Sequence, residues 1–591
     1  MKAFLTGNEA IARGAYEAGV TFAAAYPGTP STEILENIAP YKEHIYAEWS
    51  PNEKVALEVA IGASIAGARS LAAMKHVGVN VAADPLFTYA YTGVNGGLIL
   101  VSADDPGMHS SQNEQDNRYY AKFSKIAMVE PSDSQEAKDF VKIALEISEK
   151  YDTPVLFRVT TRICHSKGLV AFGEREEVGI KRYSKNIPKY VATPANGRVL
   201  HVKVEERLKK LEDFSNETEL NRIEWNDKKV GIITSSVAYQ YAKEVFGDKA
   251  SYLKLGFTYP LPMKKIKEFA DQVETLYIIE ELEPYIEEQV KAAGIACIGK
   301  DLIPRVGELN PDIIAKAILG EERPTIQYGE AEVVGRPPTM CAGCPHRGFF
   351  YMLSKKKNVM ITGDIGCYTL GSAEPLNAMD TCICMGASIS AGHGAQKAFE
   401  FHGVDKKVVG VIGDSTFFHS GVTSLMDIVY NRGNAVTVIL DNRITGMTGH
   451  QENPGTGYTL QGDKTHAINI PLLCEAVGVK KENIFVINPL DLDACNKAID
   501  DALKATEPTV IITEWPCVLK KPSPEDIEKF GVRKVICKVD EEKCKSCRIC
   551  TKTGCPAIAF DTKAIINEDM CVGCEVCLQA CPFDAIEKVG E

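Results

Sequence analysis

The sequence predicts a multidomain α/β protein with parallel sheets flanked by helices and a small cysteine-rich domain at its C-terminal end. Through most of the 591 residues, short apolar runs of strand length alternate with longer runs of helical length, which is the pattern of parallel α/β folds. The length allows about three to five domains. Eight of the 19 cysteines fall within residues 544–581, so the C-terminal end is expected to be a separate kind of domain.

The first α/β unit is predicted at residues 1–165. Residues 22–26 and 98–102 are short apolar runs that we interpret as buried strands. Between them lies an alanine-rich run at residues 54–73, which is too long for a strand and apolar on most faces. This run therefore predicts one long buried helix.

A polar linker or a small helical excursion is predicted at residues 166–228, since this stretch carries the charged run 204–210. A second α/β unit then occupies residues 229–325. Its predicted strands are the apolar runs 230–234 and 276–280.

A third α/β unit is predicted at residues 338–530, after a boundary marked by Pro337 and Pro338. Its predicted strands are residues 408–412, 435–440 and 509–513. Two further prolines, Pro522 and Pro524, open the link to a last domain at residues 535–591.

The bulk composition argues against several classes of protein. The net charge is −13 and no basic cluster dominates, which argues against a protein that binds nucleic-acid phosphates. No run is long enough to span a bilayer, and the first residues do not resemble a secretory signal. The expected location is therefore the cytoplasm, where many cysteines indicate metal ligands rather than disulfides.

The cysteines of the last domain form an internal repeat. Each half is a triplet with two-residue gaps followed by a Cys-Pro: Cys544, Cys547, Cys550 and Cys555, then Cys571, Cys574, Cys577 and Cys581. In two-cluster ferredoxins each triplet binds one [4Fe–4S] cluster, and the cysteine before proline binds the other cluster. We therefore assign Cys581 to the first cluster with the first triplet, and Cys555 to the second cluster with the second triplet.

A structural zinc site is the alternative for these cysteines, but zinc normally takes four ligands in two pairs. One departure from the ferredoxin pattern is the gap of four residues before Cys555. We expect the extra residue, near Thr553 and Gly554, to bulge a loop without removing a ligand.

Polar residues follow two predicted strands of the third unit. Asp414 follows one strand and Asn442 the next, and the carboxyl ends of parallel strands meet at one ligand-binding edge. Carboxylate and amide oxygens there suit Mg²⁺ and a phosphate-bearing ligand, whereas the alternative is two ordinary turns. Gly386 lies in a run of small residues that opens a helix, which fits either a bound diphosphate or tight helix packing.

These features together resemble the thiamine-diphosphate-dependent 2-oxoacid:ferredoxin oxidoreductases, and within them the alpha subunits that act on indolepyruvate. The resemblance spans the chain: residues 5–10, the Cys-Ala-Gly-Cys-Pro-His-Arg of residues 341–347 and the two-cluster end. The family's Gly-Asp-Gly and Asn-Asn motifs correspond to residues 413–415 and 441–442, with Ser415 and Asp441 as departures. The resemblance implies a pyrimidine-type domain, a transketolase-C-like domain, a diphosphate domain and a ferredoxin domain, in that order.

The resemblance also implies roles for individual residues. Asp414 and Asn442 would hold Mg²⁺ by their side chains and Ile444 by its carbonyl, while Gly386 would approach the diphosphate. Glu53 would activate the cofactor, with Glu48 as the second choice. The alternative for Glu53 is a plain capping box from Ser50 with a proline at the first helical position.

The loop at residues 26–31 resembles the family's Tyr-Pro-x-Thr-Pro loop, in which Thr29 would contact the substrate carboxylate. The alternative is that Ser31 and Thr32 simply cap a helix.

A third [4Fe–4S] cluster near the cofactor is predicted by the same resemblance. Its ligands would be four cysteines of the third unit: Cys341, Cys344, Cys367 and Cys517. The alternatives are buried unliganded thiols, a zinc site, or competition from the nearby Cys382 and Cys384.

The implied reaction is the CoA-dependent oxidative decarboxylation of arylpyruvates such as indolepyruvate, with ferredoxin as electron acceptor. A smaller beta subunit is the implied partner, in a heterodimer or heterotetramer. The alternatives are another 2-oxoacid such as pyruvate, a non-redox thiamine decarboxylase, and an electron-transfer subunit with a non-catalytic scaffold.

Overall fold

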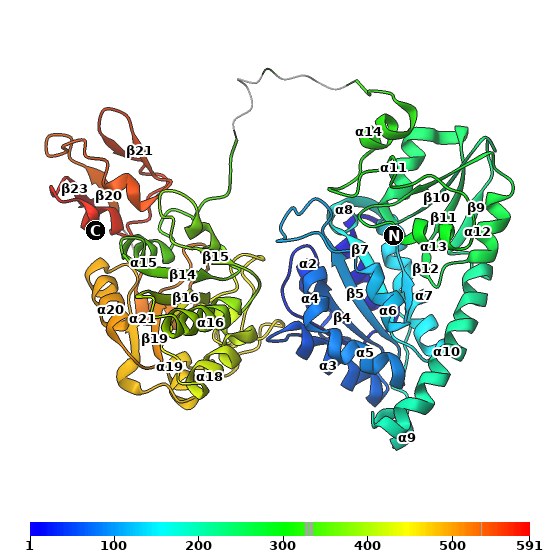
Figure 1. Cartoon of the computed structure of the whole chain (residues 1–591), viewed down its shortest axis with the longest axis horizontal. Coiled ribbons are helices and arrows are strands. Elements are labelled where there is room, and N and C mark those ends of the chain that lie inside the picture. The colour runs from blue at the N-terminus through cyan, green and yellow to red at the C-terminus, as the bar shows by residue number, and fades with distance from the viewer. Residues whose placement is uncertain (325–328, 330–334, 533–534, 591) are drawn as a thin grey trace. The chain divides into compact units, whose positions relative to one another are not determined.

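The computed structural model describes residues 1–324, 329, 335–532 and 535–590. These residues form two compact units, Met1–Gln327 and Tyr328–Glu591 (Figure 1).

The centre of the first unit is a seven-stranded sheet in the order β12-β6-β7-β5-β4-β2-β3. All neighbouring strands are parallel except β12, which runs antiparallel to β6. Its strands are β2 (Phe22–Ala25), β3 (Tyr46–Trp49), β4 (Ser70–Lys75), β5 (Leu98–Asp104), β6 (Ala127–Val129), β7 (Val155–Thr160) and β12 (Phe257–Tyr259). The predicted strands at residues 22–26 and 98–102 are confirmed by β2 and β5.

Helices pack against this sheet, and their bounds define where its carboxyl-end loops begin. They are α1 (Gly7–Glu17), α2 (Thr32–Ile38), α3 (Glu53–Ala66), α4 (His76–Val81), α5 (Ala83–Thr92), α6 (Arg118–Ser124), α7 (Ser134–Tyr151) and α8 (Thr161–His165). Helix α1 packs on α2 and α7, and α3 packs on α5. The loops after β2, β4 and β5 therefore share one edge of the sheet, because these strands are parallel.

The alanine-rich run at residues 54–73 is not one helix, so that prediction is wrong. Helix α3 ends at Ala66, and Gly67 caps it with a φ of 107°, a left-handed conformation that glycine adopts without strain. The chain then turns into β4, which is buried along its whole length. A strand covered on both faces is as apolar as a buried helix, so composition alone does not separate the two.

The rest of the first unit carries a second sheet in the order β13-β10-β11-β9. Its strands are β9 (Asn221–Glu224), β10 (Val230–Ser235), β11 (Ser251–Leu255) and β13 (Thr275–Ile279). Helices α11 (Ser236–Phe246) and α12 (Met263–Ala270) lie between them in sequence, and α13 (Tyr285–Ala292) follows β13. The predicted strands 230–234 and 276–280 are confirmed. The charged run 204–210 lies in a 24-residue helix, α10 (Pro194–Glu217), and β1 (Lys2–Thr6) pairs with β8 (Lys167–Ala171).

The second unit is built on a parallel six-stranded sheet in the order β15-β14-β16-β17-β19-β18. Its strands are β14 (Val359–Gly363), β15 (Thr381–Cys382), β16 (Lys407–Gly413), β17 (Val436–Asp441), β18 (Ile484–Ile487) and β19 (Thr509–Glu514), with α15 (His346–Leu353), α16 (Ala387–Phe401), α18 (Val422–Tyr430), α19 (Ile470–Ala476) and α20 (Leu492–Lys504) around them. The three strands predicted for this region are confirmed by β16, β17 and β19.

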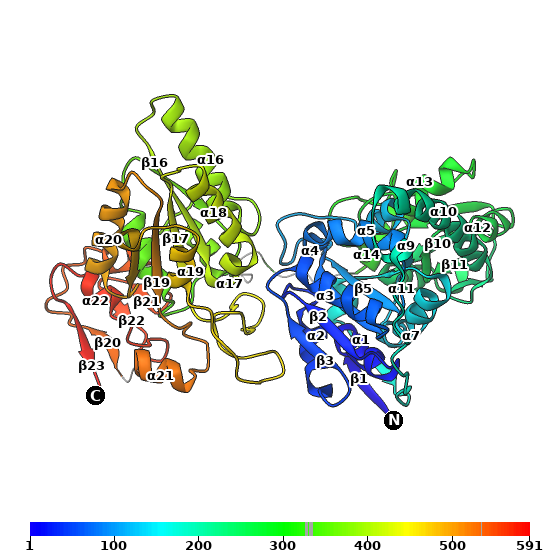
Figure 2. The same cartoon turned by 90° about the horizontal axis from the view of Figure 1, so that it is seen from below.

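The cysteine-rich domain contains two short two-stranded antiparallel sheets and one short α-helix, and it packs on helices of the six-stranded sheet. One sheet pairs the first and last strands of the domain, β20 (Ile536–Val539) and β23 (Ile586–Val589). The other is the hairpin of β21 (Ile558–Phe560) and β22 (Ala564–Ile566), and the helix is α22 (Val576–Ala580). Figures 1 and 2 show these elements beside α15 and α20. The Gln579 side chain fixes the contact, because it accepts a hydrogen bond from Leu492 N–H at 2.9 Å and donates to the Leu490 carbonyl at 2.7 Å.

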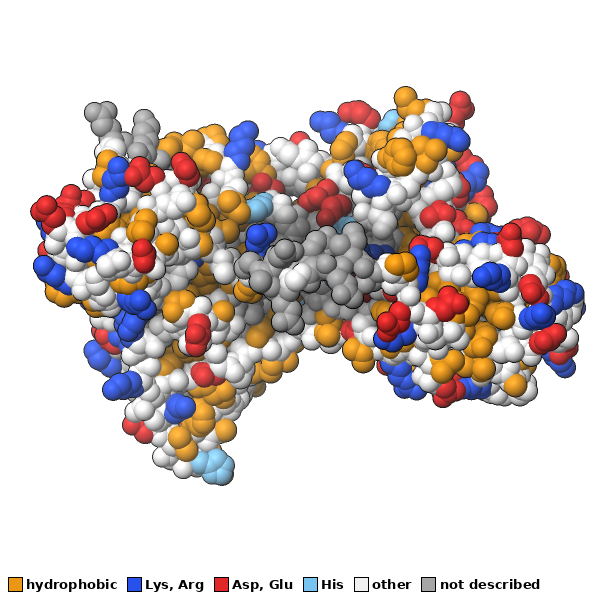
Figure 3. Space-filling model, turned by 90° about the horizontal axis from the view of Figure 1, so that it is seen from above, with side chains coloured by type: hydrophobic (Ala, Val, Ile, Leu, Met, Phe, Trp, Pro, Cys, Tyr) orange, Lys and Arg blue, Asp and Glu red, His pale blue; other side chains and the backbone are white. Residues whose placement is uncertain are grey.

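On the face shown in Figure 3, lysine and arginine side chains are interspersed with aspartate and glutamate. Within the described residues, no helix combines the length and the apolar character needed to cross a bilayer.

Candidate functional site

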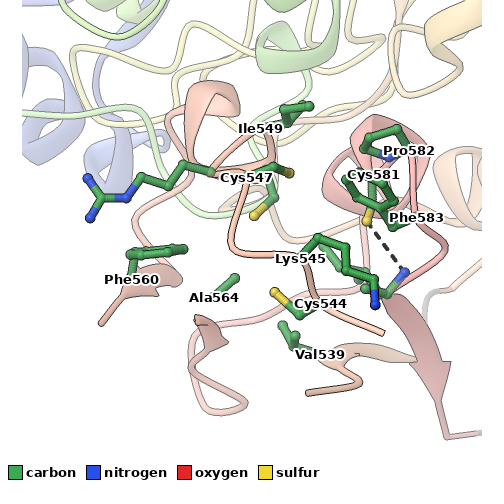
Figure 4. Close-up of a pocket in the computed structure, with 14 residues that line it drawn as sticks. Val539, Cys544, Lys545, Cys547, Ile549, Phe560, Ala564, Cys581, Pro582 and Phe583 are labelled. Atoms are coloured by element: carbon green, nitrogen blue, oxygen red, sulfur yellow. Dashed lines mark hydrogen bonds between the residues drawn. The ribbon is translucent and has the colours of Figure 1, made fainter. Parts of the chain in front are cut away.

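A small cavity in the cysteine-rich domain is lined by the four cysteines assigned to the first cluster (Figure 4): Cys544, Cys547, Cys550 and Cys581. Three come from the first triplet, and Cys581 comes from the end of the second motif. Backbone N–H groups point at these sulfurs: Ala585 N–H donates to Cys581 Sγ at 3.4 Å, and hydrogen bonds from the backbone at Ala564 and Ser546 lower the pKa of Cys544. Such donors favour the thiolate, which is the form that binds metal.

The cysteines assigned to the second cluster also come together. Cys577 is buried, and the sulfurs of Cys574 and Cys555 lie close enough to interact with its thiol electrostatically. Cys571 Sγ accepts a hydrogen bond from the Cys537 N–H at 3.3 Å. Cys537 itself is a buried residue of β20 that sequence reasoning did not single out, because it lies outside both triplets.

Four cysteines of the second unit's sheet edge form a third group. Cys367 opens the turn after β14, and Cys517 follows β19. The thiols of Cys341 and Cys344 lie within electrostatic reach of both. Burial raises the pKa of Cys344 to about 12 and of Cys367 to about 11. Iron binding here would therefore have to displace protons from neutral thiols.

The competing cysteines Cys382 and Cys384 are both exposed. The Asp364 carboxylate acts electrostatically on both thiols, and Cys384 also acts on Cys382. They thus form a separate pair beside the third group.

The spacing of the cysteine groups distinguishes a cluster from a single ion. Across the described ranges, no three histidine, cysteine, aspartate or glutamate side chains converge closely enough to hold one metal ion. A [4Fe–4S] cubane attaches its four thiolates to four different irons, so it takes a wider ring of sulfurs than tetrahedral zinc does.

A buried arginine connects the third cysteine group to the cysteine-rich domain. Arg347 is 1% exposed; its Nη2 donates to the carbonyls of Met340 and Cys341 at 2.8 and 2.9 Å, and its Nη1 donates to the carbonyl of Thr553 at 2.9 Å. Among the described residues no carboxylate pairs with it within 4.0 Å. A buried cation requires a counter-charge, and an anionic cluster at Cys341 and Cys344 would provide one.

The extra residue of the first cysteine motif takes part in this contact. Cys550–Thr553 form a 3-10 helix and Gly554 follows with a φ of 70°, so the predicted bulge near Thr553 and Gly554 is present. The Cys-x-x-Cys loop at residues 341–344 also contacts the one at residues 571–574, because a Cβ at Gly343 would lie 2.0 Å from Val572 Cγ2.

The predicted Mg²⁺ ligands lie side by side at the carboxyl ends of β16 and β17. Asp414 and Asn442 are both buried. Burial and the neighbouring Asp441 carboxylate raise the pKa of Asp414 well above its usual range, and a bound cation would favour the ionised form of this carboxylate. Asn453, which sequence reasoning missed, donates from Nδ2 to Asp414 Oδ2 at 2.9 Å. The donor set of buried oxygens thus fits Mg²⁺.

Ile444, the third predicted Mg²⁺ ligand, lies two residues after Asn442, and its N–H donates to Asn442 Oδ1 at 3.3 Å. The N–H of Cys517 donates to the Asn442 carbonyl at 2.9 Å. A Cβ at Gly446 would lie 3.6 Å from both Asn442 Nδ2 and Cys367 Sγ. The predicted cofactor site and the third cysteine group are therefore in direct contact.

Gly386 caps α16 with a φ of 86°, but its N–H is already used. Asp364 accepts hydrogen bonds from Gly386 N–H at 2.9 Å and from Ser388 N–H at 3.0 Å. Close approach of a diphosphate to Gly386 stays a prediction, and Asp364 is a buried acid that the sequence analysis did not single out.

In the first unit, Glu53 begins α3 but does not depend on a capping box. The N-cap is Asn52, whose side chain accepts from Val55 N–H at 2.9 Å, while Ser50 Oγ donates to Glu48 Oε1 at 3.2 Å. The alternative of a cap from Ser50 is therefore wrong, because β3 continues to Trp49 and the helix starts only at residue 53.

The Glu53 side chain is 5% exposed and lies against α4. A Cβ at Gly78 would lie 2.7 Å from Glu53 Oε1, so only glycine leaves room for the carboxylate there. Capping does not explain why a carboxylate is buried at this point. Glu48, the second choice, lies on β3 and accepts a hydrogen bond from Tyr46 Oη at 3.0 Å.

Thr29 lies in the loop between β2 and α2, at the same edge of the sheet as the loops after β4 and β5. Its carbonyl accepts from Ser110 Oγ at 3.4 Å. Ser31 occupies the N-cap position of α2 without a side-chain capping bond, and its Oγ donates to the Gly28 carbonyl at 2.9 Å. The hydroxyl of Ser31 thus holds the loop rather than capping the helix.

Comparison with known proteins gives matches along most of the chain. Residues 13–216 match the family model of the thiamine-diphosphate-binding domain of pyruvate flavodoxin/ferredoxin oxidoreductases. Residues 364–513 match the C-terminal binding domain of thiamine pyrophosphate enzymes. Residues 564–587 match the 4Fe-4S binding domain.

Full-length relatives are similar as well. The "indolepyruvate oxidoreductase subunit IorA" of Pyrococcus horikoshii is 43% identical over 100% of this chain and 97% of the relative, and that of Archaeoglobus fulgidus is 41% identical over 99% and 97%. A "2-oxoglutarate synthase subunit KorA" of Methanothermobacter marburgensis is 27% identical over 54% of this chain and 98% of its own length. The chain belongs to the family of indolepyruvate oxidoreductase IorA subunits, within the thiamine-diphosphate-dependent 2-oxoacid:ferredoxin oxidoreductases.

Proposed function

We propose that this chain is the catalytic subunit of an enzyme that oxidises indolepyruvate and related arylpyruvates to aryl-acetyl-CoA and CO₂, with ferredoxin as electron acceptor. The observation that carries the proposal is the contact between the two predicted sites: Cys517 N–H donates to the carbonyl of Asn442 at 2.9 Å. An iron–sulfur ligand set beside a thiamine diphosphate site suits decarboxylation coupled to electron removal, whereas decarboxylation alone needs no electron acceptor.

Bound thiamine diphosphate would supply the carbanion chemistry that lets a 2-oxoacid lose CO₂. Asp414, Asn442 and the Ile444 carbonyl would hold its Mg²⁺, and Asn453 would orient Asp414 from the second coordination sphere. Glu53 would hold and move a proton at the cofactor's aminopyrimidine ring. Its burial against Gly78 keeps water away from that carboxylate.

Three [4Fe–4S] clusters would then carry single electrons outward. Their proposed ligands are Cys341, Cys344, Cys367 and Cys517 for the proximal cluster, Cys555, Cys571, Cys574 and Cys577 for the next, and Cys544, Cys547, Cys550 and Cys581 for the last. The packing of Gly343 on Val572 supports the first transfer. The exposure of Cys547 supports an exit from the last cluster to ferredoxin.

A smaller subunit would complete the enzyme in the cytoplasm. The test is anaerobic turnover by the co-purified subunits, with a panel of 2-oxoacids, CoA and a ferredoxin or viologen acceptor. We expect kcat/KM to be higher for indolepyruvate and phenylpyruvate than for pyruvate or 2-oxoglutarate. A clear preference for pyruvate or 2-oxoglutarate would overturn the substrate class, and decarboxylation without acceptor reduction would overturn the redox role.

A further inference from the structure

A lysine without a paired carboxylate lies buried at the carboxyl end of the first unit's sheet. Lys75 ends β4, and the residue is 9% exposed. Its Nζ donates to the Ser110 carbonyl at 2.6 Å. A lysine ammonium has three donors, and within the described residues this is the one hydrogen bond that Nζ makes, with no carboxylate within 4.0 Å.

The other cations at this edge are already paired. Arg158 Nε donates to Asp104 at 2.9 Å and its Nη1 to Glu130 at 2.7 Å. Arg162 pairs with Glu308. In contrast to these two arginines, Lys75 has no carboxylate partner within the part of the chain that the structure describes, so its charge is left for a ligand.

The surroundings of Lys75 connect it to the two residues predicted to act on cofactor and substrate. A Cβ at Gly28 would lie 3.1 Å from Lys75 Cβ, so the Thr29 loop packs on the lysine stem. Ser110, which accepts from Nζ, also donates to the Thr29 carbonyl. Lys75 directly precedes α4, the helix whose Gly78 contacts the Glu53 carboxylate.

We propose that the Lys75 ammonium binds the carboxylate of the 2-oxoacid substrate, beside Thr29. The inference rests on the proposed function, because that function requires a substrate carrying one carboxylate next to its reacting carbonyl. A charge-assisted hydrogen bond from a desolvated ammonium would fix this carboxylate. The bond would be made with the bound substrate and lost as this carboxylate departs as CO₂, so it would act mainly on KM.

The charged groups around Lys75 support this assignment. Burial lowers the pKa of Lys75 to about 8, although the Asp105 carboxylate, on the segment after β5, raises it. Asp105 is itself held by Ser110 N–H, Ser111 Oγ and Thr161 Oγ1. Glu53 reaches the same helix from α3, and His76 Nε2 faces Asn113. Burial shields the Lys75 ammonium from water, and a substrate carboxylate would supply the counter-charge that this ammonium lacks.

The test compares Lys75→Met and Lys75→Arg with Lys54→Met, which removes an exposed charge nearby. We expect Lys75→Met to raise KM for the 2-oxoacid by about 10- to 100-fold, with kcat within about fivefold of the unmodified enzyme. Bound thiamine and iron should be unchanged, and Lys54→Met should behave as the unmodified enzyme does. An unchanged KM in Lys75→Met, or a fall in kcat alone, would overturn the proposal.

A pH profile provides a second measurement. The ammonium is charged below its pKa, so KM should rise as the pH increases through about 8. In Lys75→Arg the guanidinium stays charged at every accessible pH, and this rise should disappear. A purely structural lysine would leave the profile the same in both proteins, which would count against the proposal even if Lys75→Met did not fold.

Equilibrium binding separates the two hypotheses. The probe is 3-phenylpropionate, a carboxylate that lacks the reacting carbonyl, titrated calorimetrically into each enzyme. Binding that depends on Lys75 in an enzyme that oxidises no 2-oxoacid would leave the lysine assignment standing and remove the proposed function. Normal turnover together with Lys75-independent binding would remove the lysine assignment alone.

Discussion

At the scale of single residues, Glu53 is a buried carboxylate at the start of a helix that another side chain caps. Asn52 provides the cap. Helix capping and cofactor activation, the two explanations for this region, therefore belong to two different residues, Asn52 and Glu53. Each can be removed separately, which the sequence alone did not allow.

We expect Glu53→Gln to retain bound thiamine and iron but to lose about 10²–10⁴-fold in turnover, because glutamine cannot transfer the proton. The matched control is Asn52→Ala, which should cost about 0.5–2 kcal/mol of stability through the lost cap and little turnover. Steady-state kinetics and thermal unfolding measure the two effects. Normal turnover by Glu53→Gln would eliminate Glu53 as the activating residue.

Arg347 is a second residue whose expected effect, on the redox potential of a proximal cluster, follows from its buried position. Its buried positive charge lies beside Cys341 and Cys344 and should favour the reduced, more negative state of a proximal cluster. We therefore expect Arg347→Met to make that cluster's midpoint potential more negative, by about 59 mV for every ~1.4 kcal/mol of lost interaction. Redox titration followed by EPR measures it, and the Cys544 cluster serves as the internal control. A potential that does not move would show that the guanidinium is only a structural link.

At the scale of elements, the short helix α4 connects the predicted catalytic carboxylate with the proposed substrate lysine. It follows Lys75, and its Gly78 packs against Glu53 with no space for a side chain. Small movements of α4 would therefore disturb both groups at once.

We expect Gly78→Ala to lower turnover and to destabilise the chain by about 1–3 kcal/mol, because the new Cβ would overlap the Glu53 side chain. Gly62 in α3 is the matched control, since a Cβ there meets nothing within 4 Å. Gly62→Ala should be stabilising by about 0.4–1 kcal/mol without an effect on turnover. Equal behaviour of the two variants would contradict the close contact at Gly78.

At the scale of the whole molecule, the cysteine-rich domain is part of the second unit. Gln579 binds the loop before α20, and Arg347 binds Thr553. The predicted proximal site and the second cluster's loop are thus held together by these contacts.

Iron content tests this arrangement. Anaerobically prepared protein should contain about twelve iron atoms per chain, or about eight if the ferredoxin pair is all that forms. Cys517→Ser should remove the proximal cluster's EPR signal and stop reduction of the other two clusters by substrate, while dithionite still reduces them. Eight irons in the unmodified chain would disprove the third cluster.

The partner subunit is the other prediction at this scale. We expect the chain purified alone to show little oxidation of 2-oxoacids and to gain activity when co-purified with a smaller subunit. Analytical ultracentrifugation and acceptor reduction would follow the two together. Full turnover by this polypeptide alone would contradict the prediction.

The sequence by itself determined the features that depend on local spacing. The two cysteine repeats predicted their crossed grouping, and strand-length apolar runs predicted β10, β16, β17 and β19, because periodicity and turn residues act over a few neighbours. The Gly-Asp and Asp-Asn strand ends likewise predicted that Asp414 and Asn442 would meet, since parallel strands bring their carboxyl ends to one edge.

The tertiary structure decided what depends on segments far apart in the chain. The division of the alanine-rich run into α3 and β4, the use of Gly386 N–H by Asp364, and the charge left on Lys75 all follow from sheet order and from which loops share an edge. Gly67, which ends α3, is the one local signal among these, and it is easily missed because a strand buried on both faces and a buried helix are both apolar throughout. Likewise, the partner of a buried charge is chosen by packing rather than by its neighbours in sequence.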